Sequence, residues 1–301
     1  FERMGPGYND SIIGGFMSFH IVTDSCCDLP ESLTASYTDF HIANLSFTID
    51  GQPAPNSFPA KEFYNRLRNG SMSKTSQANP EVFVELYKKA LSQNKDILYI
   101  GFSSALSGTL ESGRRAKEIL GNTYPDCRII TIDSLSASMG LGYLVDQAVR
   151  LRDSGKSLEE VANWLESNKL KLNHWFTVDD LFFLQRGGRV SAGAAWFGSV
   201  LNVKPVMNMD DLGRLIPREK ILGRNKAIKR LFEKMRDMAV DPADQRVFIS
   251  HGDCIEEVEK LMDMIQQNLR TKEFVVNYVG PVIGSHTGPG VIALYFMANH
   301  R

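Results

Sequence analysis

Short apolar runs alternate along the chain with longer segments in which apolar residues recur with a helical period. In the first half, apolar runs rich in β-branched residues predict strands at 19–24, 97–102 and 127–133. Helical periodicity follows at about 80–93, 107–120 and 136–153. This alternation predicts an α/β fold whose first sheet is largely parallel.

A second series of elements begins near Trp175. Strands are predicted at 175–181, 203–209, 215–222, 246–253, 273–280 and 290–297, and helices at about 224–238 and 254–269. One face of the first of these helices is apolar, which predicts packing against a core: Ala227, Ile228, Leu231, Phe232 and Met235. We therefore expect two α/β domains, at 17–172 and 173–301, the second with a mixed sheet.

The first sixteen residues differ from the rest of the chain. Residues 1–16 have no hydrophobic period and precede Met17, which opens the first predicted strand. They lack the basic start and long apolar centre of a secretory signal, so we expect an extension or an expression remnant outside the fold. No apolar run in the chain approaches the ~20 residues of a membrane-spanning helix.

Composition narrows the class of partner. The formal net charge is −1, so the chain lacks the basic surface typical of nucleic-acid-binding proteins. The four cysteines form no Cys-x-x-Cys pair, which favours reduced thiols and a cytoplasmic location over disulfides or a zinc site. Residues 213–236 hold nine Lys or Arg against two Glu. That segment is either a solvated helix face or a docking surface for an acidic partner or an anionic membrane.

Three polar stretches raise the question of a ligand site. "SKTSQANP" at 73–80 and "GFSSALSGT" at 101–109 place hydroxyls at or just before a predicted helix, where unpaired N–H groups favour an anion. Taken singly, each is also explained as a helix N-cap. "IGSHTGPG" at 283–290 places His286 in a loop with a high density of glycines, which lets a ligand or another backbone approach closely. A structural histidine is the alternative.

Familiar catalytic motifs are missing from the sequence. There is no G-x-S-x-G elbow, no P-loop, no complete dinucleotide fingerprint and no H-E-x-x-H pair. The polar stretches therefore suit the holding of an anion better than chemistry on it.

Taken together and in order, seven motifs resemble the DegV family: "IVTDSCCDLP", "KTSQANP", "SSALSGT", "DSLSASMGLG", "FLQRGGRVS", "LNVKPVMNMD" and "SHTGPG". Members of this family are bacterial fatty-acid-binding proteins that act as the lipid-carrying subunit of fatty acid kinase. The resemblance runs from about Met17 nearly to the last residue. It implies two α/β domains with a lipid tunnel near their interface, no metal or cofactor, and one bound fatty acid such as a C16–C18 acid.

The resemblance also implies roles for particular residues. The carboxylate would be held by Thr75, Ser76, Ser107 and His286, supported by Ser25, Gly108, Thr287 and Gly288. Arg186 and Arg189 would lie near the mouth and face the kinase or the transferred phosphoryl group. The chain departs from the family at two positions, with Cys26 near a usual Ser or Thr and Ala78 in place of Pro, and both changes can alter the local shape of the tunnel.

The implied function is carriage and presentation of the acid. The partners would be an ATP-dependent fatty acid kinase, an acyltransferase that uses the acyl-phosphate and, transiently, a membrane surface, with no nucleic acid. Burying ~14 methylenes at ~0.8 kcal/mol each gives on the order of 10 kcal/mol. We expect hydroxyls and an imidazole to bind the carboxylate without a charged partner.

Two other functions remain open. A phosphotransferase or acyl hydrolase using Ser107 and His286 would turn over ATP or an acyl ester without a second protein. A binder of another small carboxylate would need a compact polar cavity, whereas a lipid requires a long apolar one.

Overall fold

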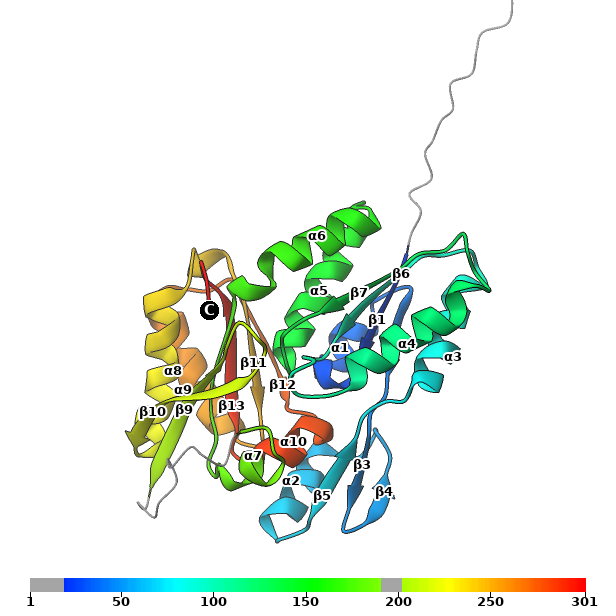
Figure 1. The fold of residues 1–301 in the computed structure, drawn as a ribbon. Coiled ribbons are helices and arrows are strands. Elements are labelled where there is room, and N and C mark those ends of the chain that lie inside the picture. Colours follow the sequence, from blue (N-terminus) through cyan, green and yellow to red (C-terminus); the bar gives the residue numbers. More distant parts are fainter. Residues whose placement is uncertain (1–18, 191–201) are drawn as a thin grey trace, which may run out of the picture.

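The computed structural model of the chain describes residues 19–190 and 202–301. The predicted extension at 1–16 and the start at Met17 lie outside the described residues. Among the helices that are described, none is long and apolar enough to cross a membrane. The strands of the described residues form three sheets, with helices packed between and around them (Figure 1).

The first sheet is parallel throughout, in the order β2-β1-β6-β7. Its strands are β1 (His20–Asp24), β2 (Phe40–Ala43), β6 (Ile97–Gly101) and β7 (Ile129–Asp133). The helices of this part are α1 (Glu31–Thr34), α3 (Pro80–Leu91), α4 (Thr109–Gly121), α5 (Met139–Asp153) and α6 (Leu158–Asn168). All of β1 and β6 is buried, as expected for central strands of a parallel sheet that helices cover on both faces.

The second sheet is mixed, in the order β10-β9-β8-β13-β11-β12. Its strands are β8 (Leu172–Thr177), β9 (Val203–Met209), β10 (Leu215–Leu222), β11 (Arg246–His251), β12 (Glu273–Tyr278) and β13 (Ile292–Met297). Only β11 and β12 pair in parallel; the other neighbours are antiparallel. The predicted α/β class, with a parallel first sheet and a mixed second sheet, is confirmed. The domain boundary near 172 stays a prediction.

Helices α8 (Arg224–Met238) and α9 (Ile255–Leu269) pack on one face of the mixed sheet, while α5 contacts β8, β11 and β13. The predicted apolar face of α8 is buried as expected. Several basic residues of segment 213–236 are paired: Arg214 with Asp210, and Arg230 and Lys234 with Glu219. This pairing favours the interpretation of the segment as a solvated face.

A third, small sheet was not predicted. It is antiparallel, in the order β4-β3-β5, and consists of β3 (Ser46–Ile49), β4 (Gln52–Ala54) and β5 (Ser73–Ser76). It shares a compact core with α2 (Ala60–Arg68). Two short helices, α7 (Phe182–Arg186) and α10 (Pro281–Thr287), lie between this small sheet and the mixed sheet (Figure 1).

The segment that carries His286 is a helix, not the predicted loop. Gly280 precedes α10 and Pro281 is its first residue, where a missing N–H costs nothing and the fixed φ suits a helix. The helix ends at Gly288, whose φ of +75° favours glycine. His286 therefore stands on a rigid element that contacts α7, α2 and β5.

Candidate functional site

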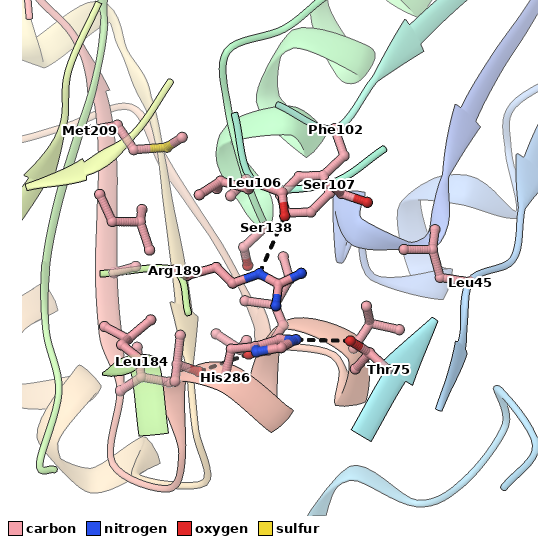
Figure 2. Close-up of a pocket in the computed structure, with 18 of the residues that line it drawn as sticks. Leu45, Thr75, Phe102, Leu106, Ser107, Ser138, Leu184, Arg189, Met209 and His286 are labelled. Carbon is pink, nitrogen blue, oxygen red and sulfur yellow. Dashed lines mark hydrogen bonds between the residues drawn. The ribbon is translucent and has the colours of Figure 1, made fainter. Parts of the chain in front are cut away.

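A cavity of about 280 Å³ lies where the three sheets meet, close to the lower end of the ~300–1,000 Å³ of small-molecule sites. Segments that follow the strands of the parallel sheet line it on one side, and β8, β9, β13 and α10 line it on the other (Figure 2). Ligand sites of α/β proteins lie at this carboxyl edge of the strands.

Most of the cavity wall is apolar. The lining hydrophobic residues are Leu45, Phe102, Leu106, Ala137, Phe176, Leu184, Met209, Leu215, Val279, Val282, Ile283, Val291 and Ala293. They come from both large sheets and from α10, so the apolar space extends between the parts of the chain before and after residue 172. Such a wall suits an alkyl chain, since every methylene it buries is removed from water.

Polar groups gather at one end of this space (Figure 2). Oγ1 of Thr75, on β5, lies 2.8 Å from Nε2 of His286, on α10. Ser107 lines the same cavity, and its Oγ accepts the backbone N–H of Thr109, the first residue of α4, at 3.2 Å. Ser107 thus bonds to the first residue of α4, whose N-cap is Gly108, and also lines the cavity.

Arg189 also lines the cavity, beside His286 (Figure 2). Its Nε–H donates to the carbonyl of Leu106 at 3.3 Å, and a second guanidinium N–H donates to the carbonyl of Gly187. Within residues 19–190 and 202–301 it forms no ion pair with a carboxylate. The sequence predicted carboxylate binding without a charged partner; the structure places a guanidinium in the lining, and no carboxylate of the described residues pairs with it.

The electrostatics keep His286 neutral at physiological pH. Burial, followed by the positive charges of Arg189 and Arg186, lowers the pKa of His286 to about 4. Nδ1 is buried without a hydrogen-bond partner among the described residues and packs so closely on Gly187 that a Cβ there would overlap it. When Nε2 carries the proton of the neutral ring, it donates to Thr75, whose own O–H is then free for a ligand oxygen.

The other predicted site residues divide into two groups. Ser76, Gly108 and Thr287 line the cavity with the residues above. Three others do not: Ser25, Gly288 and Arg186. Ser25 contacts the lining indirectly, because its Oγ accepts a 3.0 Å hydrogen bond from the backbone N–H of the lining residue Leu45.

Arg186 and Gly288 lie outside the cavity, around α7. The Arg186 guanidinium stands 4.8 Å from the ring centroid of Phe183, and its Nη1 lies 3.1 Å from Sδ of Met72. Gly288 packs against the same Phe183, where a Cβ would come within 2.6 Å of the ring. Arg186 therefore does not line the cavity, although its positive charge acts on His286, which does.

Several polar residues around the cavity were not predicted from the sequence. They are Gln77, whose side chain packs against Gly108, and Ser138, His174 and Tyr295. Ser138 donates a 2.6 Å hydrogen bond to Asp28, a carboxyl whose pKa burial raises to about 7. Ser138 and Asp28 both fall within motifs that the sequence analysis singled out, "DSLSASMGLG" and "CCDLP". No sequence pattern indicated that the two side chains form a hydrogen bond.

The geometry does not assemble an esterase-like pair. A nucleophile and its base need direct hydrogen-bond contact, but the hydrogen-bond partner of His286 within the described residues is Thr75, and that of the Ser107 hydroxyl is Thr109. Among the described residues there is also no group of three or more His, Cys, Asp or Glu side chains arranged to hold a metal ion. The two departures from the family pattern, Cys26 and Ala78, are buried and do not line the cavity.

Known proteins share this architecture. A DegV domain-containing protein of Clostridium perfringens is 42% identical over 287 residues, which is 94% of this chain and 98% of that protein. The structure of a DegV family protein from Thermus thermophilus, described by its fatty acid binding, has a TM-score of 0.85 at 30% identity and covers 94% of this chain and 100% of that one. DegV of Bacillus subtilis, described as a fatty acid binding protein, has a TM-score of 0.82 at 29% identity, with 94% and 100% covered.

The resemblance indicated by the seven motifs is thus supported by similarity over nearly the whole chain. A family model described as "Uncharacterised protein, DegV family" matches residues 18–299. Since that match spans nearly the whole sequence and the fold agrees with it, the chain belongs to the DegV family.

Proposed function

We propose that this protein binds one long-chain fatty acid in the cavity and presents its carboxylate to a separate ATP-dependent fatty acid kinase. The observation that carries the proposal is the polarity of the cavity. A guanidinium that pairs with no carboxylate of the described residues, a neutral imidazole and hydroxyls stand at one end, and an apolar wall forms most of the rest. An amphiphilic anion is the ligand class that matches both parts.

The energetics support retention of such a ligand. An alkyl chain of ~14 methylenes gains on the order of 10 kcal/mol on burial at ~0.8 kcal/mol each. An ionised carboxylate is costly to desolvate unless donors replace its water. Arg189 and the hydroxyls of Thr75 and Ser107 supply those donors, the guanidinium through a charge-assisted hydrogen bond. The related proteins of Thermus thermophilus and Bacillus subtilis are described as binding fatty acids.

The absence of a nucleophile–base pair in the described part of the chain supports presentation rather than catalysis. In the proposed cycle the kinase phosphorylates the bound carboxylate, and the acyl-phosphate then passes to an acyltransferase of phospholipid synthesis in the cytoplasm. Arg186, outside the lining, would meet the kinase or the phosphoryl group. Phe182 and Met72, which are 57% and 45% exposed beside it, would support transient contact with a membrane surface.

The decisive experiment begins with native mass spectrometry of the protein purified from a heterologous host. We expect a bound species with the mass of a fatty acid. After delipidation and reloading with palmitate, the acid should be phosphorylated only when a fatty acid kinase and ATP are added. Protein that repeatedly shows no bound lipid and does not take up palmitate would refute the binding function. Turnover of ATP or of an acyl ester by the isolated chain would favour the enzyme alternative.

A further inference from the structure

Two serine side chains join β5 to α10 next to the Thr75–His286 pair. Oγ of Ser73 and Oγ of Ser285 lie 2.6 Å apart, and the two residues are only 7% and 3% exposed. Neither of them lines the cavity. Any effect of these two serines on ligand binding must therefore act through the residues that line the cavity.

The Ser73–Ser285 and Thr75–His286 contacts lie side by side between β5 and α10. Side chains two residues apart in a strand lie on the same face, so Ser73 and Thr75 both face α10. In that helix Ser285 directly precedes His286. The Ser73–Ser285 bond therefore links the same two elements as the 2.8 Å contact between Thr75 and His286.

Each serine oxygen also lies near a backbone carbonyl: Ser73 Oγ is 2.9 Å from the carbonyl oxygen of Thr48 on β3, and Ser285 Oγ is 2.7 Å from that of Pro281. Because each hydroxyl has one proton, one serine donates to the other, and only the accepting serine can donate to its carbonyl. The pair thus joins the small sheet to α10 through one Ser–Ser hydrogen bond and one serine–carbonyl hydrogen bond. Gly284 packs on Tyr64 of α2, where a Cβ would lie 2.6 Å from Oη. That packing is steric, whereas the serine bond has a direction and a fixed length.

We propose that the Ser73–Ser285 hydrogen bond is a positioning contact that holds the His286 imidazole against the Thr75 hydroxyl, and so strengthens carboxylate binding without touching the ligand. The inference rests on the proposed function. Without this bond the apolar packing of α10 remains, but the distance between Thr75 and His286 is no longer fixed. Binding of the anionic head should weaken, and binding of the alkyl tail should not.

The test compares palmitate with methyl palmitate, which keeps the tail and lacks the anionic head. Ser73→Ala and Ser285→Ala should each bind palmitate about fivefold more weakly, the factor carried by roughly one net hydrogen bond, and bind the ester as the wild type does. The double variant should be no weaker than either single one, because both remove the same bond. Ser73→Thr keeps the hydroxyl and should restore wild-type affinity.

Thr23→Val is the matched control. It removes a buried hydroxyl that donates to the Ile100 carbonyl at 2.9 Å in the parallel sheet, so it should lower stability without changing palmitate affinity. A second readout is the ¹H–¹⁵N signal of the His286 ring, which should shift in Ser73→Ala and stay in place in Thr23→Val. If an alanine variant does not fold, Ser73→Cys, which retains the volume but is a weak donor, must show the same palmitate-specific loss.

Two results would overturn the positioning role and leave the proposed function intact. One is wild-type palmitate affinity in both alanine variants, and the other is equal weakening toward palmitate and its ester. If the wild type binds neither probe, the proposed function itself fails, and the inference fails with it.

Discussion

Thr75 and His286 are 211 positions apart in the sequence, yet Oγ1 and Nε2 of these residues lie 2.8 Å from each other. Thr75 belongs to β5 of the small sheet, and His286 belongs to α10, which connects β12 and β13 of the mixed sheet. The polar end of the cavity is therefore created by the packing of the small sheet on α10. A substitution in the interface between β5 and α10 should alter binding of the carboxylate head group, even where no residue that lines the cavity is replaced.

Arg189 should carry most of the discrimination between a carboxylate and its ester. Because its guanidinium has no carboxylate partner among the described residues, Arg189→Met should reduce palmitate affinity by about 10- to 100-fold, the range of one hydrogen bond to a charged group. Affinity for methyl palmitate should hardly change. Isothermal titration with both ligands measures the difference. Arg114→Met, on the exposed side of α4, is the control; equal losses in both variants would argue against a specific role for Arg189.

His286 should make stability depend on pH in acid solution. Its pKa is about 4 in the folded protein, lowered by burial and by Arg189 and Arg186, against 6.5 in the unfolded chain. Between these values the unfolded state binds a proton that the folded state does not, so the free energy of unfolding should fall as pH drops from about 6.5 to about 4. The loss attributable to this group is on the order of 3 kcal/mol at ~1.4 kcal/mol per pKa unit.

Urea unfolding of the wild type and of His286→Gln at several pH values checks this prediction. Other buried histidines, such as His174 and His251, also have lowered pKa values because of burial, so the relevant quantity is the difference between the two proteins at each pH. That difference should shrink or reverse toward pH 4. A difference that is constant from pH 7.5 to pH 4 would show that the imidazole titrates normally in the folded state.

The long elements of the fold were predictable because their hydrophobic periods are long and regular. The small sheet was missed for a physical reason: β3, β4 and β5 have only four, three and four residues. In β5 all four side chains, Ser73 to Ser76, are polar, so its sequence matches a helix-capping segment as well as a strand. It becomes a strand because it pairs with β3 and meets α10, and neither neighbour is close to it in sequence.

The polar end of the site was predictable only in part. The motifs singled out Thr75, Ser107 and His286, which do gather at the cavity. Arg189 was expected near the mouth, but its place in the lining depends on a turn at Gly187 and Gly188, the latter with a φ of +70°. The direction of a side chain after such a turn is set by tertiary packing. For α10, the Gly280–Pro281 pair was a usable helix-start signal that the density of glycines obscured.

Asp28 should have the opposite pH dependence to that of His286. Burial raises its pKa to about 7 in the folded protein from 3.8, despite the hydrogen bond from Ser138 and that from the backbone of Gly280. Its protonated form is therefore favoured by folding, a contribution present below about pH 4 and lost as pH rises toward 7. Relative to Asp28→Asn, the wild type should become less stable across this interval. Parallel unfolding curves for the two proteins from pH 4 to pH 8 would contradict the prediction.

The size of the apolar space should limit the length of the bound acid. Ala293 on β13 lines the cavity beside its register partner Phe176 on β8, which also lines it. Ala293→Leu adds three carbon atoms to this wall, so the longest acid that fits should shorten by about two or three methylenes, each worth ~0.8 kcal/mol on burial. Affinity for the longest acid bound by the wild type should then fall by about 10- to 50-fold, while a shorter acid is retained. Mass spectrometry of co-purified lipid and competition titrations with a series of saturated acids measure both effects.

The neighbouring Ile292 belongs to the core on the other face of the sheet, so Ile292→Val should leave the length preference unchanged. An unaltered preference in Ala293→Leu would mean that the alkyl chain does not pass this residue.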